Sequence, residues 1–420
     1  MTDVAPFRGL RYDPARVDLG RVLVPPYDVV TPRERAAYWE RDPHHAIRLE
    51  LTRDPDEEAT TDYGSVAETL ARWRSEGVLR ADRAPALYAL RQSFTAPGGE
   101  ALQRTGFFGA LHLEDYAERV VRPHERTLAG PKADRLKILR ATRANLSPIF
   151  LLYEDREQAL AGALGAAFDV EVVSARDDAG TLHELAPVTG AAAEALRAFL
   201  ADRPVVIADG HHRYETALAY RDECRGGAHT GGDEPWERTL AYFANAHAPG
   251  SLLLPIHRVI LKGSAPTDAA WRERLPGWEE TRAPLAEGEV IADALARHLA
   301  PLTDRHAFAA DDGSGTLRLF SREKDAVLCV RAVHHDVIEG VFGLDETAVR
   351  DGAVAFPKSA SEAARAVREG RGAVALYLNP LRPDDVFAVT ARGEVLPQKS
   401  TFFFPKLPSG LVFRSFEDTR

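Results

Sequence analysis

The feature that most constrains this chain is a short apolar run that ends in a dense polar cluster, VVIADGHHR at residues 205–213. The four apolar residues 205–208 predict a short buried strand. Asp209 and Gly210 have the composition of a tight turn, because glycine tolerates a positive φ angle and the close approach of a ligand. Residues 213–223 continue as a predicted helix. The sequence therefore predicts a strand, a tight turn and a helix in immediate succession.

The polar residues of this elbow (residues 205–213) are suited to binding an anion. The first turn of a helix presents unpaired backbone N–H groups and the positive end of the helix dipole. His211 and His212 add donors there, and Arg213 can hold a phosphate through two parallel hydrogen bonds. Asp209 can hold a metal ion or a substrate hydroxyl or amine. The alternative is a plain surface turn, with Asp209 as the helix cap and solvated histidines.

A second polar segment, PHERT at residues 123–127, precedes a basic stretch. Glu125 is a candidate general base if it reaches the elbow, and otherwise an exposed carboxylate. The basic stretch either forms one solvated helix face or supplies a local positive field for an anionic ligand. Its cations are Lys132, Arg135, Lys137, Arg140 and Arg143.

Both ends of the chain supply further candidates. Tyr27 and Asp28 follow two prolines and form either a rigid loop that lines a site or a packing turn. Near the C-terminus, a lysine–serine–threonine run lacks the glycine pattern that precedes a phosphate-binding loop. The run can still contact phosphates, together with a lysine that follows it: Lys399, Ser400, Thr401 and Lys406.

The composition limits the kinds of partner and the cellular compartment that we expect for this protein. The formal net charge of −10 argues against nucleic-acid binding, which needs a basic surface. Two cysteines far apart in sequence make no disulfide framework, and we find neither a signal peptide nor an apolar run of roughly 20 residues. We therefore expect a cytoplasmic protein that does not enter a membrane.

The pattern of predicted elements indicates a mixed fold, α/β or α+β. Residues 86–90, 105–111 and 147–153 predict strands, and residues 190–202 predict a helix. From about residue 264 the composition shifts toward Ala, Arg, Glu and Asp, which suggests a soft domain boundary near residue 265. Beyond it we expect strands at 316–320, 326–333 and 373–378 and a helix at 361–369.

Several long strings resemble the DUF1015 family of uncharacterised bacterial and archaeal proteins over nearly the whole chain. They are VPPYDV at 24–29, PHERT at 123–127 with DRL at 134–136, NLSPIF at 145–150, ADGHHRYE at 208–215 and QKSTFFFPK at 398–406.

A more distant resemblance is to the ParB/sulfiredoxin superfamily, especially its free serine kinases. It rests on a Pro-His-Glu segment followed later by Asp-Gly-His-His-Arg. The resemblance implies that Glu125 is the catalytic base, that Asp209 holds serine or a metal ion, and that His212 with Arg213 holds phosphate. About 80 residues separate Glu125 from Asp209, so an insertion is implied. Histidines stand where sulfiredoxin has its reactive cysteine, which argues against redox activity.

The same resemblance implies a ParB/sulfiredoxin-like core with large additions at both ends: an N-terminal region at 1–115, the core at 116–265 and a C-terminal region at 266–420. The catalytic residues would be Glu125, Asp209 and His212, with Asp209 also the metal ligand. Phosphate or nucleotide would contact Gly210, His211, Arg213, Lys132, Arg135, Lys399, Ser400 and Thr401. The residues lining the substrate would be Tyr27, Asp28, His124 and Asn145.

The leading hypothesis is a nucleotide-dependent phosphotransferase that acts on a small hydroxylated metabolite, with free L-serine as the best candidate. ATP or ADP would be the phosphate donor, and Mg²⁺ would accompany it. The alternatives are a phosphatase of a small phosphometabolite such as phosphoserine, and a non-enzymatic nucleotide-binding switch or scaffold. A small substrate and a nucleotide are the expected partners, and the protein could also form a homodimer.

Overall fold

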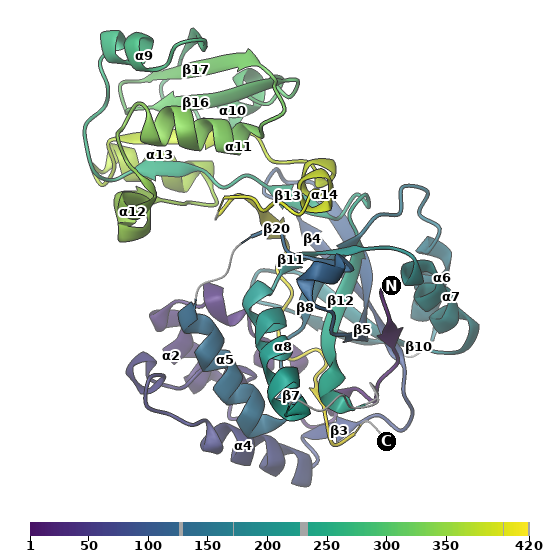
Figure 1. The fold of residues 1–420 in the computed structure, drawn as a ribbon. Coiled ribbons are helices and arrows are strands. Elements are labelled where there is room, and N and C mark those ends of the chain that lie inside the picture. Colours follow the sequence, from purple (N-terminus) through teal and green to yellow (C-terminus); the bar gives the residue numbers. More distant parts are fainter. Residues whose placement is uncertain (126–128, 171, 227–233, 398, 419–420) are drawn as a thin grey trace. The chain divides into compact units, whose positions relative to one another are not determined.

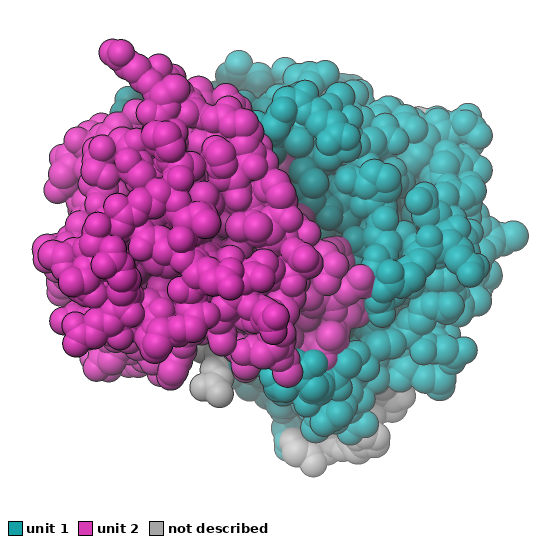
Figure 2. Space-filling view, turned by 90° about the horizontal axis from the view of Figure 1, so that it is seen from above, with its two compact units in different colours: residues 1–252, 390–395, 405–420 teal, residues 253–389, 396–404 magenta. Residues whose placement is uncertain are grey.

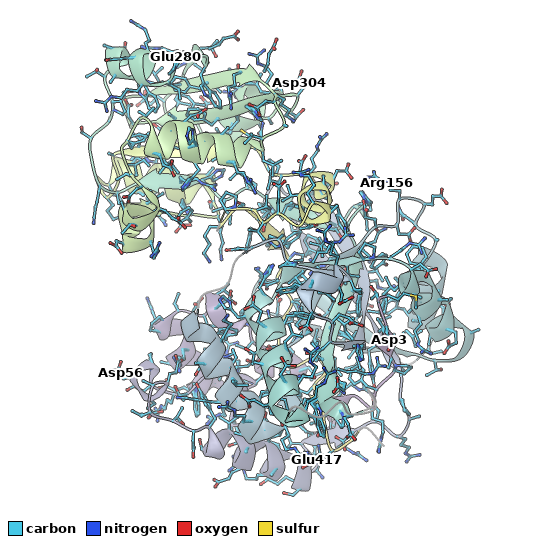
Figure 3. The ribbon with its side chains drawn as sticks, in the orientation of Figure 1. Asp3, Asp56, Arg156, Glu280, Asp304 and Glu417 are labelled. Atoms are coloured by element: carbon cyan, nitrogen blue, oxygen red, sulfur yellow. The ribbon has the colours of Figure 1, made fainter. Side chains whose placement is uncertain are left out.

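The computed structural model describes residues 1–125, 129–170, 172–226, 234–397 and 399–418, and shows a mixed α/β protein (Figure 1). The chain forms two compact units, coloured separately in Figure 2. The first unit consists of residues 1–252, 390–395 and 405–420, and the second of residues 253–389 and 396–404. Asp56 and Arg156 of the first unit and Asp304 of the second are among the charged side chains that are exposed (Figure 3).

The first unit is built on a mixed sheet of nine strands. Eight of them follow the order β6-β11-β8-β12-β5-β4-β10-β9, and β1 also pairs with β5. The pairs β6–β11 and β8–β12 are parallel, and the other pairs are antiparallel. The strands are β1 (Val4–Ala5), β4 (Leu87–Thr95), β5 (Ala101–His112), β6 (Val121–Arg122), β8 (Ile149–Tyr153), β9 (Val173–Arg176), β10 (Leu182–Val188), β11 (Val205–Asp209) and β12 (Arg238–Asn245).

One face of this sheet carries the main core of the first unit. Alternate strand residues such as Phe107, Leu151 and Ile207 pack there against Leu164 of α6 and Leu196 of α7. Central strands that are buried along their length, such as IFLLY of β8, are typical of a sheet covered on both faces. The helices of this unit are α1 (Leu19–Val22), α2 (Pro32–Arg41), α3 (Ile47–Glu50), α4 (Gly64–Ser75), α5 (Ala129–Thr142), α6 (Ala161–Ala166), α7 (Gly190–Ala201) and α8 (His211–Arg225).

Local sequence signals explain where several of these helices start. The Thr31 hydroxyl oxygen accepts a hydrogen bond from the Glu34 amide, and the Thr31 amide donates one to the Glu34 carboxylate, with Pro32 at the first turn. The sequence TPRE at residues 31–34 predicts this capping box, and the structure confirms it. Two short ribbons, β2 (Leu10–Tyr12) with β3 (Leu79–Ala81) and β7 (Ala144–Asn145) with β21 (Arg414–Ser415), complete the unit. The second ribbon ties the C-terminal segment to the first unit.

The second unit has an antiparallel sheet of six strands in the order β15-β17-β16-β19-β14-β18. Residues along β16 and β19 alternate between two hydrophobic clusters, one on each face. Helices α10 and α13 cover one face, and α9 with α11 and the π-helical turns after it cover the other. The elements are β14 (Arg258–Ile260), α9 (Asp268–Arg274), β15 (Glu279–Pro284), α10 (Ile291–His298), β16 (Arg305–Asp311), β17 (Thr316–Glu323), α11 (Cys329–Ala332), α12 (Glu346–Ala348), β18 (Val354–Ala355), α13 (Ala360–Arg368), β19 (Val374–Leu378) and α14 (Pro383–Ala391). A separate ribbon pairs β13 (Leu252–Leu254) with β20 (Phe402–Phe404).

The structure confirms most of the predicted elements and corrects two. The strand predicted at 326–333 is wrong, because Cys329–Ala332 and Val333–Glu339 are helical turns. Their apolar residues fall on one side of a helix, as Val330, Val333 and Val337 show by packing in one cluster. The sequence of residues 120–127 predicts a loop, whereas Val121 and Arg122 form β6. Within the described residues, no helix is long and apolar enough to cross a membrane. The division into regions 1–115, 116–265 and 266–420, with a ParB/sulfiredoxin-like core, stays a prediction.

Candidate functional site

The elbow forms as the sequence predicts, with β11 leading through one residue into α8 (Figure 1). Gly210 occupies the N-cap position of α8 with φ = +93°, a conformation that residues with a Cβ rarely adopt. A Cβ placed there would lie 3.0 Å from the Arg213 Nε, because the guanidinium folds back over the turn. Glycine is therefore required here both by the backbone angle and by the arginine that covers it.

Asp209 lies at the end of β11 and is held by two cations. Its Oδ2 is 3.3 Å from the Lys406 Nζ and 3.6 Å from the Arg213 Nη2, and its Oδ1 accepts a hydrogen bond from the Gly210 amide at 3.1 Å. Burial on its own would raise the pKa of Asp209, but the attraction of Lys406 and Arg213 outweighs it and lowers the pKa to about 2. Asp209 is therefore ionised at neutral pH and is a weak base.

The Arg213 guanidinium spans the space between the elbow and β8. Its Nη1 donates a hydrogen bond to the carbonyl of Pro148, the residue just before β8. Its Nε is buried and has no hydrogen-bond partner among the described residues. Gly210 has no side chain with which to cap α8, so the first turn of this helix receives no side-chain cap from it. The elbow thus keeps a buried cationic N–H group beside the positive end of a helix.

A pair of buried histidines joins the PHERT segment to the elbow. The His124 amide donates a hydrogen bond to the His211 Nε2 at 3.2 Å, and the two rings meet edge to face with centroids 4.6 Å apart. The His124 Nδ1 is hydrogen-bonded to the carbonyl of Ile207 in β11. Burial lowers the pKa of His124 to about 4 and that of His211 well below its usual range, so both rings are neutral at pH 7. The two motifs, far apart in sequence, therefore meet.

A buried arginine holds the segment that carries Lys406. The Arg104 Nη2 donates a hydrogen bond to the Pro405 carbonyl at 2.7 Å, and its Nε donates to the Gln92 Oε1 at 3.0 Å. The guanidinium also lies 4.6 Å from the ring centroid of Phe150, in β8. Gln92 continues the network to the ring of His183. Arg104 therefore fixes the backbone next to Lys406 against the sheet.

The elbow contains only part of the predicted site. The Lys132 Nζ is paired with the Glu215 carboxylate at 2.8 Å, on the facing helix α8. Arg135 is buried between Glu50 and Asp134, and its guanidinium lies 4.1 Å from the ring centroid of Tyr27. These contacts account for the charges of both cations within the fold.

The other predicted residues lie in varied surroundings. Burial raises the pKa of Tyr27, while the charges of Arg135 and Arg213 act against that rise. The Asn145 Oδ1 accepts hydrogen bonds from the Leu240 amide and the Arg414 Nη1, both at 3.1 Å, so this side chain joins β7, β12 and the C-terminal segment.

The remaining candidates differ in their exposure and in the unit to which they belong. Glu125 and His212 are half-buried, and Asp28 is exposed. Three predicted residues belong to the second unit, where the Ser400 hydroxyl donates to the Pro397 carbonyl: Lys399, Ser400 and Thr401. Three residues of the quoted strings lie outside the described residues: Arg126, Thr127 and Gln398.

Sequence reasoning missed three features of the elbow. It gave Lys406 only a phosphate contact, whereas the structure pairs Lys406 with Asp209. It did not single out Arg104 or the carbonyl of Pro148. The proline in each of the strings NLSPIF and QKSTFFFPK was the available signal, because a proline fixes the backbone beside each contact.

Comparisons with known proteins place the chain in a family. A family model described as a protein of unknown function (DUF1015) matches residues 4–327. Solved structures that align with the chain include a conserved hypothetical protein from Pyrococcus furiosus, at 14% identity and a TM-score of 0.36, over 75% of this chain and 97% of that one. A free serine kinase mutant in complex with ADP aligns at 13% identity and a TM-score of 0.38, over 75% and 94% of the two chains.

SbnI from Staphylococcus aureus, with a C-terminal truncation, aligns at 12% identity and a TM-score of 0.35, over 73% and 86% of the two chains. No curated protein matches this chain. The family model covers well over half of the 420 residues. The chain therefore belongs to the DUF1015 family.

Proposed function

We propose that this protein binds a nucleotide at the elbow and transfers a phosphoryl group to a small hydroxylated metabolite, with free L-serine as the best candidate. The observation that carries the proposal is the buried Arg213 Nε, which has no hydrogen-bond partner among the described residues and lies at the N-terminus of a helix of 15 residues. An unpaired buried donor is costly unless a ligand supplies the acceptor. A phosphate oxygen is a suitable acceptor at this position.

Phosphoryl transfer needs mainly positioning and stabilisation of charge, and the elbow is suited to both. Arg213 and the first amides of α8 would hold the phosphates of the nucleotide. The acceptor hydroxyl would attack the terminal phosphorus and form a new P–O bond, while the bond to the leaving nucleotide breaks. Glu125 would take the hydroxyl proton, because His124 places that segment beside α8 and because the low pKa of Asp209 makes it a poor base.

Asp209 serves better as an anchor than as a metal ligand. Its carboxylate faces Lys406 and Arg213, which compete with a cation for its oxygens. The donor set at Asp209 does not fit a resident Mg²⁺, which prefers a cage of oxygen ligands. We therefore assign Asp209 the role of orienting Lys406 and Arg213 toward the phosphates. A Mg²⁺ ion would arrive with the nucleotide.

The proposal is tested by measuring ligand binding and product formation on the full chain. Melting temperatures with ATP or ADP, with and without Mg²⁺, are compared between the wild type, Arg213→Gln and Arg225→Gln. Arg225 is a matched control, because it lies on the last turn of the same helix and pairs with Glu237. We expect a nucleotide to raise the melting temperature of the wild type and of Arg225→Gln only.

Product formation separates binding from chemistry. Wild-type protein incubated with L-serine and the stabilising nucleotide should form phosphoserine, detected by mass spectrometry. Glu125→Gln should bind the nucleotide as the wild type does and lose most of the turnover. If no nucleotide stabilises the wild type, or if Arg213→Gln is stabilised equally, the elbow is not a nucleotide site. Nucleotide binding with no phosphoserine would refute L-serine as the acceptor.

A further inference from the structure

The first unit contains a cavity at the opposite end of β8 from the elbow. Its volume is about 290 Å³, and its lining includes Tyr153 at the end of β8, Asn245 at the end of the parallel strand β12, and Gly165 of α6. Arg213 contacts the carbonyl of Pro148, at the start of β8. Five residues of extended strand span roughly 16 Å, so this cavity is a separate place from the elbow.

A buried carboxylate forms one wall of the cavity. Asp155 is 5% exposed, and its two oxygens accept hydrogen bonds from the amides of Ala159 and Leu160 at 3.0 and 3.1 Å. Asn245 fixes the same residue, because its side-chain amide bonds both the amide and the carbonyl of Asp155. Among the described residues, no cation pairs with Asp155. A preorganised carboxylate with only neutral partners favours a ligand that brings a positive group.

Hydrogen-bond donors lie elsewhere on the lining. Arg91 uses its Nε and Nη2 to bind Glu184, both at 2.8 Å, and lies with its guanidinium 4.3 Å from the ring centroid of Phe168. Within the described part of the chain, its Nη1 bonds no other group. The Tyr153 hydroxyl likewise has no hydrogen-bond partner among the described residues, although Tyr153 as a whole is only 1% exposed. These donors favour a ligand that carries a carboxylate.

The rest of the lining combines apolar side chains with the polar Gln103, Thr105 and Gln158, and the space is small. Leu160, Leu164 and Phe168 supply hydrophobic surface. Ligand pockets range from roughly 300 to 1,000 Å³, so a cavity of about 290 Å³ suits a compact molecule rather than a nucleotide. We infer that this cavity binds a free amino acid: its ammonium group faces Asp155, its carboxylate faces Arg91 and Tyr153, and its side chain packs on Leu160, Leu164 and Phe168. This site is independent of the proposed phosphotransfer.

Two glycines of α6 allow a matched test. A Cβ at Gly162 or at Gly165 would meet no atom within 4 Å, so both positions accept a larger side chain. Only Gly165 lines the cavity. Gly165→Leu is therefore expected to fill the site, and Gly162→Leu is expected to leave it open. Both changes replace a helical glycine with a good helix former, so neither should unfold the protein.

The measurement is the melting temperature of the full chain with each of the protein amino acids in turn, at millimolar concentration. L-Serine is left out of this panel because the proposed function places it at the elbow. At least one should raise the melting temperature of the wild type and of Gly162→Leu by about 2 °C or more, and should leave that of Gly165→Leu unchanged. The matching amine without a carboxylate and the matching acid without an ammonium group should have little effect. Asp209→Asn should respond as the wild type does, which separates this site from the elbow.

The inference is overturned if no amino acid stabilises the wild type, if the shift survives in Gly165→Leu, or if the amine or the acid alone acts as well as the amino acid. Calorimetric titration of two further variants gives a second test should Gly165→Leu fail to fold. Arg91→Gln is expected to weaken binding at least tenfold, and Glu184→Gln is expected to retain it. Equal binding by these two variants would also overturn the inference.

Discussion

Replacing Lys406 with methionine should destabilise the first unit by about 2 kcal/mol at pH 7. At 3.3 Å, the attraction between the Lys406 and Asp209 charges is about 5 kcal/mol for an effective dielectric constant near 20. Burying the carboxylate offsets part of this gain, and the side chains retain 20% and 16% exposure, which allows some screening. The pKa sets the scale of the effect: lowering it from 3.8 to about 2, the combined result of burial and of the nearby cations, corresponds to about 2 kcal/mol, since a tenfold change in an equilibrium constant is about 1.4 kcal/mol.

The same pair predicts a pH dependence with a definite sign. The folded pKa of Asp209 lies below its ordinary value, so its contribution is fully present above about pH 3.8 and is lost as the pH falls toward 2. In Lys406→Met the pKa of Asp209 rises, because the larger of the two cationic attractions that oppose burial is removed. The loss of stability over this acid range should therefore be smaller in the variant than in the wild type.

Native-state amide hydrogen exchange of peptides from α8 measures the stability of the first unit. A double-mutant cycle with Lys406→Met and Asp209→Asn isolates the pair from any other contact of Lys406. We expect a coupling free energy of about 1–3 kcal/mol at pH 7. A coupling below about 0.5 kcal/mol would show that Asp209 does not depend on Lys406, and would refute the reasoning.

Three further perturbations test other parts of the first unit. Gly210→Ala should lower the free energy of unfolding by about 1–3 kcal/mol, because of the positive φ and the close contact with the guanidinium, whereas the control Gly162→Ala should raise it slightly. Urea unfolding measures both, and equal stabilities of the two variants would contradict the strain at Gly210. The pKa of His124 in the folded protein is about 4, below the ordinary 6.5, so the free energy of unfolding should fall by about 3 kcal/mol as the pH is lowered from 6.5 to 4. His124→Gln should reduce this loss, whereas His335→Gln should not, because the His335 side chain is 81% exposed. Arg104→Met leaves two buried acceptors without their donor, so it should lower the free energy of unfolding by about 2–4 kcal/mol. It should also raise the deuterium uptake of a peptide spanning residues 402–409, and unchanged uptake would refute the anchoring role of Arg104.

The parts of the fold that depend on local sequence were predictable. The apolar run 205–208 and the glycine after Asp209 are sufficient to indicate a strand and a tight turn, since each feature acts within a few residues. The capping box at Thr31 and Glu34 likewise fixes the start of α2. By contrast, the apolar residues at 326–333 suit a strand and a buried helix equally, and only packing in the second unit decides in favour of helical turns.

The partners of Asp209 could not be predicted in the same way. Arg213 is four residues away, so the helix itself brings it close, but Lys406 follows almost 200 residues later. No periodicity or local propensity specifies such a contact, which requires the network of Arg104 and the Pro405 carbonyl. Glu125 illustrates the same limit, because only the contact of His124 with His211 shows that its segment reaches the elbow.

The first unit is discontinuous in sequence, so its parts are synthesised at different times, with those of the second unit between them. The sheet strands that carry Asp209 belong to residues 4–245, and they are translated well before residue 406. Domains generally fold as units during synthesis, so the sheet can form while the second unit is still being made. Of its two cationic partners, Asp209 then has only Arg213 until the segment that carries Lys406 has been synthesised. A nascent chain that stops before residue 406 would thus contain the sheet without the Lys406–Asp209 pair, and the activity proposed for the elbow would begin only once residue 406 has been made.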